Sequence, residues 1–420
     1  MSMTLNEKQQ KAYDLMTQGK NIFITGGGGV GKSWLIKYFT ERTYKNVAIT
    51  STTGVSSLII GGSTLHSYLG IGLGRDSVNK LVSNIRKKSF YKNRWLELDI
   101  LIIDEISMLN PELFDKLNDI AQTLRRTMRP FGGIQIILSG DFCQLPCVDS
   151  SSFCFEAETW NDVIKHTIHL DEIIRQRDRD FQICLNEIRL GNIPENVQKI
   201  INRCVGITFD KTNQIKPTKL YPLNRSVDSV NNRKLEKLIN KNGTQYEYNI
   251  DFVNNTRRKL DKDSMSKYCL APETLILTEN CQVMLIYNLD HDLGLVNGSR
   301  GVVTRFEDDL PVVKFMNGVE KTIDFNTWEI TEKDKVIATL SQIPLRLGYA
   351  FSIHKSQGCT LDYAIIDLSN IFEYGMGYVA LSRVKSLDGL SIKKINWDQI
   401  VCHPKAVEFY KKIKNKKNNT

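Results

Sequence analysis

Four short apolar runs divide the first third of the chain, and residues with a helical pattern separate them. The runs are Asn21 to Thr25, Val47 to Ile49, Ile100 to Ile103 and Ile134 to Leu138. Runs this short and this uniformly apolar are typical of central parallel strands that are buried on both faces. Because strands alternate here with helical patterns, the sequence predicts an α/β domain whose parallel sheet is flanked by helices.

Polar or glycine residues follow each of these runs. Gly26 follows the first run and Thr50-Ser51-Thr52-Thr53 the second, while Asp104-Glu105 and Ser139-Gly140-Asp141 follow the third and fourth. The carboxyl ends of parallel strands share one edge of a sheet, where the ligands of α/β proteins bind. We therefore expect the four polar tails to converge and to form a phosphate site.

Two kinds of strand are predicted in the second half of the chain. A second parallel sheet is expected from Lys219 to Leu223, Tyr349 to Ser352, Ala364 to Asp367 and Leu390 to Ile392. Short strands without a helical period lie between them, at Leu275 to Leu277, Gln282 to Ile286, Gly301 to Arg305, Val312 to Met316 and Val319 to Phe325. Asn317-Gly318 predicts a two-residue hairpin turn, and Asn297-Gly298 marks another turn. This pattern favours a small β-barrel.

The composition adds limits to this picture. A chain of 420 residues with 41% hydrophobic and 25% charged residues is typical of a soluble globular protein of two or three domains. No run approaches the roughly 18 apolar residues of a membrane span, and Met1 to Gln18 has no signal-peptide pattern. Nine cysteines without a CxxC pair indicate free thiols in a reducing intracellular compartment. The formal net charge of +9 favours a polyanionic partner.

The tail of the first strand is the most specific motif in the chain. Gly26-Gly27-Gly28-Gly29-Val30-Gly31-Lys32-Ser33 matches GxxxxGK[ST] between a predicted strand and a predicted helix. Glycines allow the backbone N–H groups to face the phosphates at a helix N-terminus, where anions are favoured. Lys32 would neutralise charge on the β- and γ-phosphates, and the Ser33 hydroxyl would bind Mg²⁺. The motif predicts a site for ATP.

Two further tails supply the chemistry of hydrolysis. Asp104 would hold Mg²⁺ through its water shell, and Glu105 would orient and deprotonate the attacking water. An Asp-Glu pair after a strand is commonplace on its own, but here it follows a phosphate loop. In Gly140-Asp141-Phe142-Cys143-Gln144-Leu145-Pro146, the neutral Gln144 side chain could bond both the γ-phosphate and a water, and so report the nucleotide state. Without the other motifs, this heptapeptide would indicate only a turn.

These motifs resemble a known family. GGGGVGKS, DEISM and GDFCQLP resemble motifs I, II and III of superfamily 1 helicases, and are most similar to those of the PIF (petite integration frequency) family, relatives of RecD. The segment from Asp115-Lys116-Leu117 to Pro130-Phe131-Gly132-Gly133 resembles the family's own signature. The resemblance implies two RecA-like P-loop motor domains with parallel sheets, and an SH3-like β-barrel insertion in the second. The expected ranges are 1–170 for the first domain with a small wedge at about 70–97, 171–272 with 344–420 for the second, and 273–343 for the insertion.

Three further segments would complete the nucleotide site. Leu5-Asn6-Glu7-Lys8-Gln9 resembles the Q-motif, in which Gln9 would read the adenine edge. Ile174-Arg175-Gln176 resembles motif IV and Tyr378-Val379-Ala380-Leu381-Ser382-Arg383 motif VI, which makes Arg175 and Arg383 candidate arginine fingers. A cation on the transferring phosphate is worth about 10³–10⁵ in rate, and no arginine follows Lys32 within the first motif. By the same resemblance, Gln357 and Gly358 of motif V belong to the nucleotide site.

Candidate contacts to the nucleic acid come from three segments. They are Thr50-Ser51-Thr52-Thr53-Gly54 (motif Ia), Thr64-Leu65-His66-Ser67-Tyr68, and Ile353-His354-Lys355-Ser356-Gln357-Gly358 (motif V). The resemblance assigns to the nucleic acid Thr52, His66, His354, Lys355 and Ser356. Arg86 to Trp95 interleaves five cations with three aromatics. It could stack bases or split a duplex, or equally form an amphipathic helix with Phe90 and Trp95 buried. Lys405 to Thr420, with six lysines, is either a solvated end or an extra phosphate contact.

The resemblance implies an ATP-dependent DNA helicase that translocates 5′ to 3′ on single-stranded DNA and unwinds tailed or forked duplexes, in replication, repair or recombination. It would use ATP and Mg²⁺, and we expect a monomer without a membrane partner. An RNA translocase stays open because no motif reads the 2′-hydroxyl. Intact Lys32, Glu105, Arg175 and Arg383 count against a non-enzymatic strand binder. Motifs Ia and V count against a P-loop ATPase that remodels proteins.

Overall fold

The structure, a computed structural model, describes residues 5–52, 57, 60–147, 152–209, 215–255, 271–290, 292–332 and 335–418. The chain divides into two compact units. Unit 1 comprises Met1–Ile200, Phe372–Ser382 and Trp397–Thr420, and unit 2 comprises Ile201–Ile371 and Arg383–Asn396. Among the described residues, no helix combines the length and apolar character that crossing a membrane requires.

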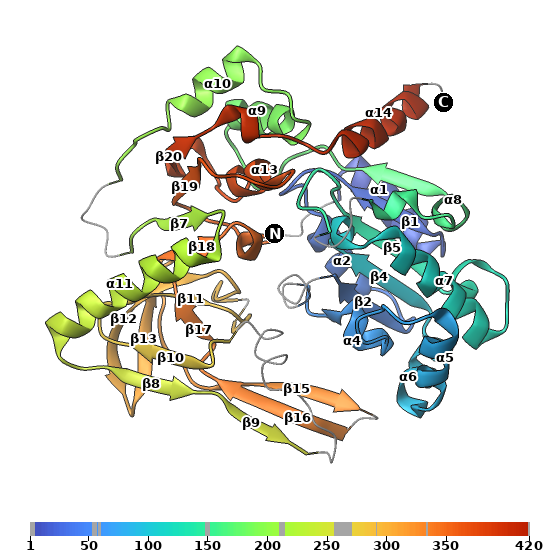
Figure 1. Cartoon of the computed structure of the whole chain (residues 1–420), viewed down its shortest axis with the longest axis horizontal. Helices are drawn as coiled ribbons and strands as arrows, with labels where there is room; N and C mark the ends of the chain where they lie inside the picture. Colours follow the sequence, from blue (N-terminus) through green and yellow to red (C-terminus); the bar gives the residue numbers. More distant parts are fainter. Residues whose placement is uncertain are drawn as a thin grey trace. The chain divides into compact units, whose positions relative to one another are not determined.

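The sheet of unit 1 is entirely parallel and has the strand order β3-β2-β4-β5-β1-β6 (Figure 1). Its strands are β1 (Ile22–Thr25), β2 (Val47–Ser51), β3 (Ser63–Thr64), β4 (Ile100–Asp104), β5 (Gln135–Gly140) and β6 (His166–His169). The four strands predicted from apolar runs form its centre, and β1, β4 and β5 are buried throughout. The edge strands β3 and β6 were not predicted, because neither contains an apolar run.

Alternate residues of the central strands face two separate hydrophobic cores. Phe23, Leu101 and Ile103 pack into one core, while Ile22, Ile24, Ile100 and Ile102 pack into the other. Side chains of a strand alternate between the two faces, so a strand covered on both faces must be apolar at every position. This burial explains why the runs are continuously apolar, as the sequence pattern predicts.

Helices surround this sheet, and local sequence sets several of their ends. The helices among the described residues of unit 1 are α1 (Glu7–Thr17), α2 (Lys32–Thr40), α4 (Leu65–Leu69), α5 (Val78–Arg86), α6 (Ser89–Glu97), α7 (Pro111–Arg125), α8 (Trp160–Val163), α9 (Arg179–Arg189), α13 (Met376–Leu381) and α14 (Pro404–Asn418). The helix α10 (Glu195–Asn202) begins in unit 1 and ends in unit 2. Asn6 and Gln9 form a capping box at the start of α1. Asn110 caps α7, whose first residue is Pro111.

The lysine-rich C-terminal stretch forms the helix α14, and part of this helix is packed in the core of unit 1. Ala406 and Tyr410 are buried in the larger core, and the ring of Phe409 stacks on Phe155 with centroids 4.3 Å apart. Lys405, Lys411, Lys412 and Lys414 of this helix are exposed. One face of α14 therefore belongs to the core of unit 1, while its cationic face stays in solvent.

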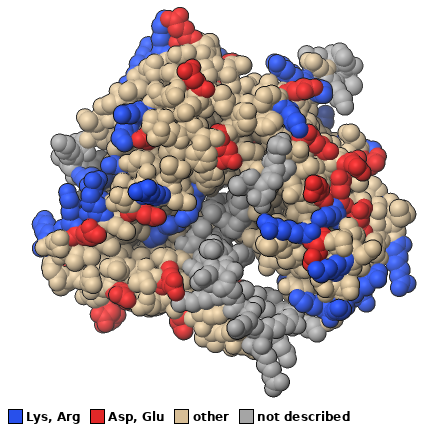
Figure 2. All heavy atoms as spheres, in the orientation of Figure 1, with Lys and Arg blue, Asp and Glu red and all other residues tan. Residues whose placement is uncertain are grey.

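The basic and aromatic segment of the predicted wedge lies in α5 and α6. Trp95 is completely buried, and its Nε1 donates to the carbonyl oxygen of Leu69 at 3.0 Å. The Arg94 guanidinium lies 3.9 Å from the ring centroid of the half-buried Phe90. The amphipathic-helix interpretation is thus confirmed for Trp95, which is not available to stack on bases. Basic side chains remain exposed over this part of unit 1, at the lower right of Figure 2.

Unit 2 contains the second parallel sheet that the sequence predicts. Its order is β18-β7-β19-β20, and all its pairings are parallel. The strands are β7 (Thr218–Tyr221), β18 (Ala350–Ser352), β19 (Ala364–Leu368) and β20 (Leu390–Ile395), and α11 (Asn224–Asn242) follows β7. The Asn231 side chain of α11 bonds both the N–H and the carbonyl of Ala350, which fixes the helix to the edge of the sheet.

The rest of unit 2 is antiparallel. Its strands are β8 (Tyr246–Asn249), β9 (Asp251–Asn254), β10 (Thr274–Leu277), β11 (Gln282–Leu285), β12 (Arg300–Glu307), β13 (Leu310–Phe315), β14 (Glu320–Thr322), β15 (Asn326–Glu332), β16 (Lys335–Gln342) and β17 (Leu345–Leu347). A hairpin joins β13 to β14 at the predicted place, with Gly318 at φ +88°. Its loop has three residues, 316–318, and not the predicted two, because Lys314 lies opposite Glu320 and the N–H of Phe315 donates to the Val319 carbonyl at 2.7 Å. The five-stranded sheet β14-β13-β12-β11-β17 stays open in the strand pairing of the described residues, so the expected closed barrel is not found there.

Candidate nucleotide site

The phosphate loop connects β1 to α2 at the carboxyl edge of the sheet. Gly29 and Gly31 have φ values of +84° and +86°, a conformation that residues with a side chain rarely adopt. Gly31 is the N-cap of α2, and Lys32 is its first residue. The loop therefore presents its backbone at a helix N-terminus, as an anion site requires.

Lys32 lies at the centre of the polar strand tips. Its ammonium donates to the carbonyl oxygens of Gly26 and Gly27, at 2.8 and 2.9 Å. Burial lowers the pKa of Lys32, and the nearby carboxylates of Asp141, Glu105 and Asp104 oppose that shift. The residues after β1, β4 and β5 thus converge on one cation, as predicted from their position at the carboxyl ends of parallel strands.

Asp104 ends β4 and is almost fully buried. Burial raises the pKa of Asp104, while hydrogen bonding to its carboxylate, including that from the Ser33 hydroxyl, and the charge of Lys32 lower it. Hydroxyl and carboxylate oxygens are ligands that Mg²⁺ prefers. Ser33 and Asp104 therefore lie together in an arrangement that fits this ion.

Glu105 has an unusual backbone for a residue with a side chain. Its φ and ψ are 52° and 47°, in the left-handed region. The hydroxyl of Thr52 donates to its carbonyl oxygen at 2.8 Å. On the other side, a Cβ added to Gly140 would lie 2.8 Å from the nitrogen of Ile106, so glycine permits the close approach of β5 to this turn. Thr53 and Gly54 of the same motif Ia lie outside the described residues.

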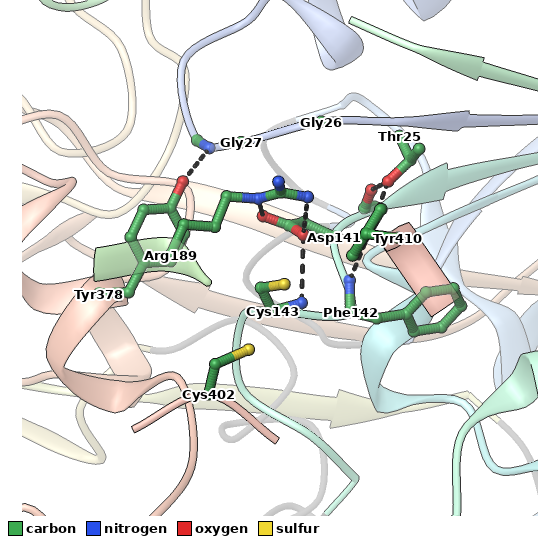
Figure 3. A network of polar contacts seen from close by, with 12 residues as sticks. Thr25, Gly26, Gly27, Asp141, Phe142, Cys143, Arg189, Tyr378, Cys402 and Tyr410 are labelled. Carbon is green, nitrogen blue, oxygen red and sulfur yellow. Dashed lines mark hydrogen bonds and ion pairs between the residues drawn. The ribbon is translucent and has the colours of Figure 1, made fainter. Parts of the chain in front are cut away.

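A buried ion pair supports the third strand tip (Figure 3). Arg189, at the end of α9, donates from Nε and Nη2 to the two carboxylate oxygens of Asp141, at 2.8 and 2.7 Å. Burial pulls the pKa of Asp141 upward, but Arg189, the charge of Lys32 and the N–H of Cys143 together more than offset this and hold the pKa below its ordinary value. The same carboxylate accepts from the N–H of Cys143 at 3.1 Å. The pair thus orders the turn that leads to the buried Gln144.

Two tyrosines from late in the sequence reach the same region (Figure 3). The Tyr410 hydroxyl lies 2.6 Å from Oγ1 of Thr25 and accepts from the N–H of Phe142 at 3.0 Å. Thr25 donates its only proton to the Gly140 carbonyl, so Tyr410 is the donor to Thr25. The Tyr378 hydroxyl accepts from the N–H of Gly28 at 2.7 Å. Sequence reasoning did not find Arg189 or these tyrosines as part of the site.

Motif IV lies directly against the phosphate loop. The backbone N–H of Arg175 donates to the Gly29 carbonyl at 3.1 Å, and its Nη1 donates to the Ser382 carbonyl at 3.1 Å. A Cβ added to Gly29 would lie 2.5 Å from Cβ of Arg175, which shows how closely the two segments pack. The structure therefore brings the first candidate finger next to the loop.

Gln9 contacts the loop from α1. Its Oε1 accepts from the N–H of Asn6 at 3.1 Å, whereas its buried Nε2 has no partner among the described residues. A Cβ added to Gly31 would lie 2.9 Å from this Nε2. An amide donor is thus buried beside the phosphate loop, and a base with an acceptor at its edge would satisfy it.

The remaining candidates are distributed between the two units. His66 lies on α4 of unit 1, where burial lowers the pKa of its imidazole. Unit 2 contains Arg383, Gln357, Gly358, His354, Lys355 and Ser356. Arg383 and Gln357 are buried, and the Ser356 hydroxyl donates to the Ile353 carbonyl at 2.7 Å. Burial and the nearby Arg346 lower the pKa of Lys355.

The signature segment is a structural element of unit 1. The carboxylate of Asp115 accepts from the backbone N–H groups of Glu158 and Thr159, at 3.1 and 3.0 Å. Asn118 accepts from the N–H of Phe131 at 2.8 Å, and the Phe131 ring is buried in the core. These contacts fix α7 to its neighbours and do not reach the strand tips.

A phosphate loop on one strand of a parallel sheet and an Asp-Glu pair two strands away define a P-loop ATPase. A family model described as PIF1-like helicase matches residues 4–199, and a second one, DNA helicase Pif1, 2B domain, matches residues 262–306. The chain belongs to the PIF1-like helicase family, a family of ATP-dependent DNA helicases.

Individual relatives agree with this assignment. The chain is 36% identical to ATP-dependent DNA helicase PIF1 of Xenopus laevis, over 98% of its own length and 65% of the relative's. It is 39% identical to protein 030L of Invertebrate iridescent virus 6, over 98% of its own length and 94% of the relative's. The chain therefore spans about two thirds of the frog helicase and almost all of the viral protein.

Solved structures show the same fold. The crystal structure of Pif1 helicase from Candida albicans superimposes with a TM-score of 0.84 at 36% identity, covering 98% of this chain and 100% of that one. A Bacteroides Pif1 in complex with ADP-AlF3 and single-stranded DNA gives a TM-score of 0.71 at 27% identity, covering 100% and 99%. The expected family is thus confirmed.

Proposed function

We propose that this chain is an ATP-driven DNA helicase that moves 5′ to 3′ along single strands and unwinds tailed or forked duplexes, in replication, repair or recombination. The observation that carries the proposal is Lys32, half-buried in a phosphate loop and close to the carboxylates of Asp104, Glu105 and Asp141. The Bacteroides relative bound to a nucleotide analogue and single-stranded DNA supports the same pair of ligands. We expect the active form to be a monomer.

In this proposal, residues of unit 1 perform the hydrolysis of ATP. The backbone from Gly26 to Val30 and Gly31 cradles the phosphates, and Lys32 neutralises their charge. Glu105 accepts a proton from the attacking water, and Gln144 bonds the γ-phosphate. Ser33 and Asp104 would hold Mg²⁺, which supplies charge neutralisation on the phosphates when bound. The buried Nε2 of Gln9 would bind the adenine edge.

Arg175 and Arg383 act as arginine fingers in the proposed cycle. A finger stabilises the charge of the transferring phosphoryl group and is worth about 10³–10⁵ in rate. The packing of Arg175 on Gly29 supports its part of this role. Gln357 and Gly358 of motif V complete the proposed nucleotide site. Because Arg175 already packs on the phosphate loop, turnover would then depend on bringing Arg383 to the nucleotide, which couples hydrolysis to movement.

The proposed contacts to single-stranded DNA are His66, His354, Lys355 and Ser356. They would bind its phosphates through positive charge or hydrogen bonds. The resemblance also assigns Thr52 to this set, but we do not propose its hydroxyl as a contact to a DNA phosphate, because that hydroxyl already donates to the Glu105 carbonyl. The second parallel sheet supports a second motor domain, proposed as residues 171–272 and 344–420 besides the first of 1–170, although residues 171–200, 372–382 and the helix α14 pack with unit 1. The antiparallel β-strands from β10 to β16 support an SH3-like insertion of residues 273–343. In the proposal, this insertion guides the single-stranded DNA.

ATP hydrolysis by the purified chain, without nucleic acid, with single-stranded DNA and with RNA of the same sequence, tests the proposal. We expect strong stimulation by DNA that Lys32→Ala abolishes, and Glu105→Gln should bind ATP without turning it over. Unwinding is then measured on 5′-tailed and 3′-tailed duplexes. Hydrolysis that responds to neither nucleic acid would refute the helicase proposal, and stimulation by RNA alone would favour an RNA translocase. Retained turnover in Glu105→Gln would disprove the role of that residue.

A further inference from the structure

Thr52 joins the tips of two neighbouring strands. In the parallel pairing of β2 with β4, Ser51 lies opposite Asp104, so Thr52 and Glu105 are the first residues beyond the pair. The Thr52 hydroxyl donates to the Glu105 carbonyl at 2.8 Å, and its N–H donates to the Asp104 carbonyl at 3.3 Å. A residue of motif Ia is thus bonded to both acidic residues of motif II.

Glu105 needs support of this kind. A residue with a side chain keeps a left-handed backbone only when its surroundings hold it there, and such residues gather at functional sites. The turn is held from one side by Thr52 and approached closely from the other by Gly140. Because the direction of the Glu105 carboxylate follows from this backbone, the Thr52 bond bears on the geometry of the attacking water.

We propose that Thr52 is a positioning residue for ATP hydrolysis, whose hydroxyl fixes Glu105 in its left-handed conformation. The inference rests on the proposed function, in which Glu105 activates the water. A hydroxyl carries one proton, so the Thr52 hydroxyl cannot donate to the Glu105 carbonyl and to a DNA phosphate at the same time. When bound DNA moves motif Ia, this bond therefore transmits the movement to Glu105. In this way the bond links DNA binding to ATP hydrolysis.

Two substitutions of Thr52 separate the hydroxyl from the shape of the side chain. Thr52→Val keeps the β-branched shape and removes the hydroxyl, whereas Thr52→Ser keeps the hydroxyl. With saturating single-stranded DNA, we expect kcat of Thr52→Val to fall on the order of ten-fold or more, because small misplacements of catalytic groups are costly. Its KM for ATP and its Kd for a fluorescent oligonucleotide should match those of the wild type, and Thr52→Ser should retain kcat.

A double-mutant cycle distinguishes positioning from a general structural role. If Thr52 acts through Glu105, Thr52→Val should cause little further loss of kcat in a Glu105→Asp variant, whose shortened carboxylate is already displaced from the attacking water but still supports measurable turnover. A loss of structure would instead lower kcat in both backgrounds. Equal urea midpoints of Thr52→Val and Thr52→Ser are the folding control.

Three outcomes would overturn the inference. Wild-type kcat in Thr52→Val would show that the hydroxyl does not position Glu105. Loss of oligonucleotide affinity with kcat restored at saturating DNA would make Thr52 a strand contact instead. Equal damage by serine and valine would exclude the hydroxyl as the cause. Each of these leaves hydrolysis by the wild type intact, whereas failure of the proposed function would remove DNA-stimulated hydrolysis from the wild type itself.

Discussion

The guanidinium of Arg189 holds both carboxylate oxygens of Asp141, through Nε at 2.8 Å and Nη2 at 2.7 Å. Both side chains are almost fully buried, and the guanidinium carbon also lies 4.4 Å from the ring centroid of Tyr410. The stem of Arg189 passes beside the phosphate loop, where a Cβ on Gly27 would lie 3.6 Å from Cδ. One ion pair therefore connects α9, the tip of β5 and the loop that would hold the phosphates.

Breaking this pair should destabilise unit 1. We expect Arg189→Met and Asp141→Leu each to cost about 3–5 kcal/mol, because each leaves an uncompensated buried charge. The double variant Arg189→Met/Asp141→Leu, which buries no charge, should recover most of that loss. Urea-induced unfolding of the four proteins measures the coupling. Single variants as stable as the wild type, or purely additive losses, would show that the pair contributes little.

The same pair predicts a dependence of stability on pH. Arg189, helped by the charge of Lys32 and the N–H of Cys143, holds the pKa of Asp141 below its ordinary value of 3.8, despite the burial that raises it. The folded state therefore binds the proton less readily than the unfolded state does, so the carboxylate stabilises the fold above pH about 4. This stabilisation is lost as the pH falls below that value toward the lower pKa of the folded protein. Unfolding midpoints from pH 7 to 3 should fall less steeply in the Arg189→Met/Asp141→Leu variant.

The positions of these residues explain which parts of the site were predictable. The phosphate loop and the central strands are local patterns, in which an apolar run and the residues after it define both the strand and its tip. Arg189 and Asp141 are 48 residues apart, and Thr25 and Tyr410 are 385 apart. A single arginine or tyrosine does not indicate a partner at such a distance. Such contacts become visible only when the sheet brings the strand tips together.

The lysine-rich composition of the C-terminal segment also led the sequence analysis to miss the helix α14. The many lysines of Lys405 to Thr420 favoured a solvated end, although Ala406, Phe409, Tyr410 and Ile413 recur at helical spacing. That apolar stripe packs in the core, and the lysines occupy the opposite face. In unit 2, the sequence pattern predicted the strands β10 to β14 but not β8, β9 or β15 to β17, and it predicted a hairpin loop one residue too short. The closure of a sheet depends on pairing between distant strands. The pattern along the chain contains no information on that pairing.

Removal of the Tyr410 hydroxyl should weaken the attachment of α14 to the strand tips. In Tyr410→Phe, the buried N–H of Phe142 loses its acceptor and Thr25 loses its donor. A buried polar group without a partner costs about 1–3 kcal/mol, so the unfolding midpoint should fall accordingly. Tyr44→Phe is the matched control, since Tyr44 is fully exposed and should change stability by less than about 0.5 kcal/mol. Equal stability of both variants would show that the Tyr410 bonds are energetically neutral.

The two candidate fingers can be distinguished from ordinary surface arginines by kinetics. Arg175→Ala and Arg383→Ala should each lower DNA-stimulated kcat about 10³-fold or more, because a finger acts on charge that develops in the transition state. Binding of an ATP analogue and of an oligonucleotide should change little. Lysine at either position should restore only part of kcat, since its ammonium lacks the planar fork of arginine.

The control for both fingers is Arg177→Ala. Arg177 is exposed and lies two residues from Arg175, so its removal tests the general loss of positive charge in this segment. We expect this variant to hydrolyse ATP as the wild type does. Should Arg383→Ala turn over normally while Arg175→Ala fails, one arginine alone would supply the cation. Should both variants turn over normally, the charge on the γ-phosphate would have to be balanced by Lys32 and the divalent cation, and the proposed dependence of hydrolysis on motifs IV and VI would be wrong.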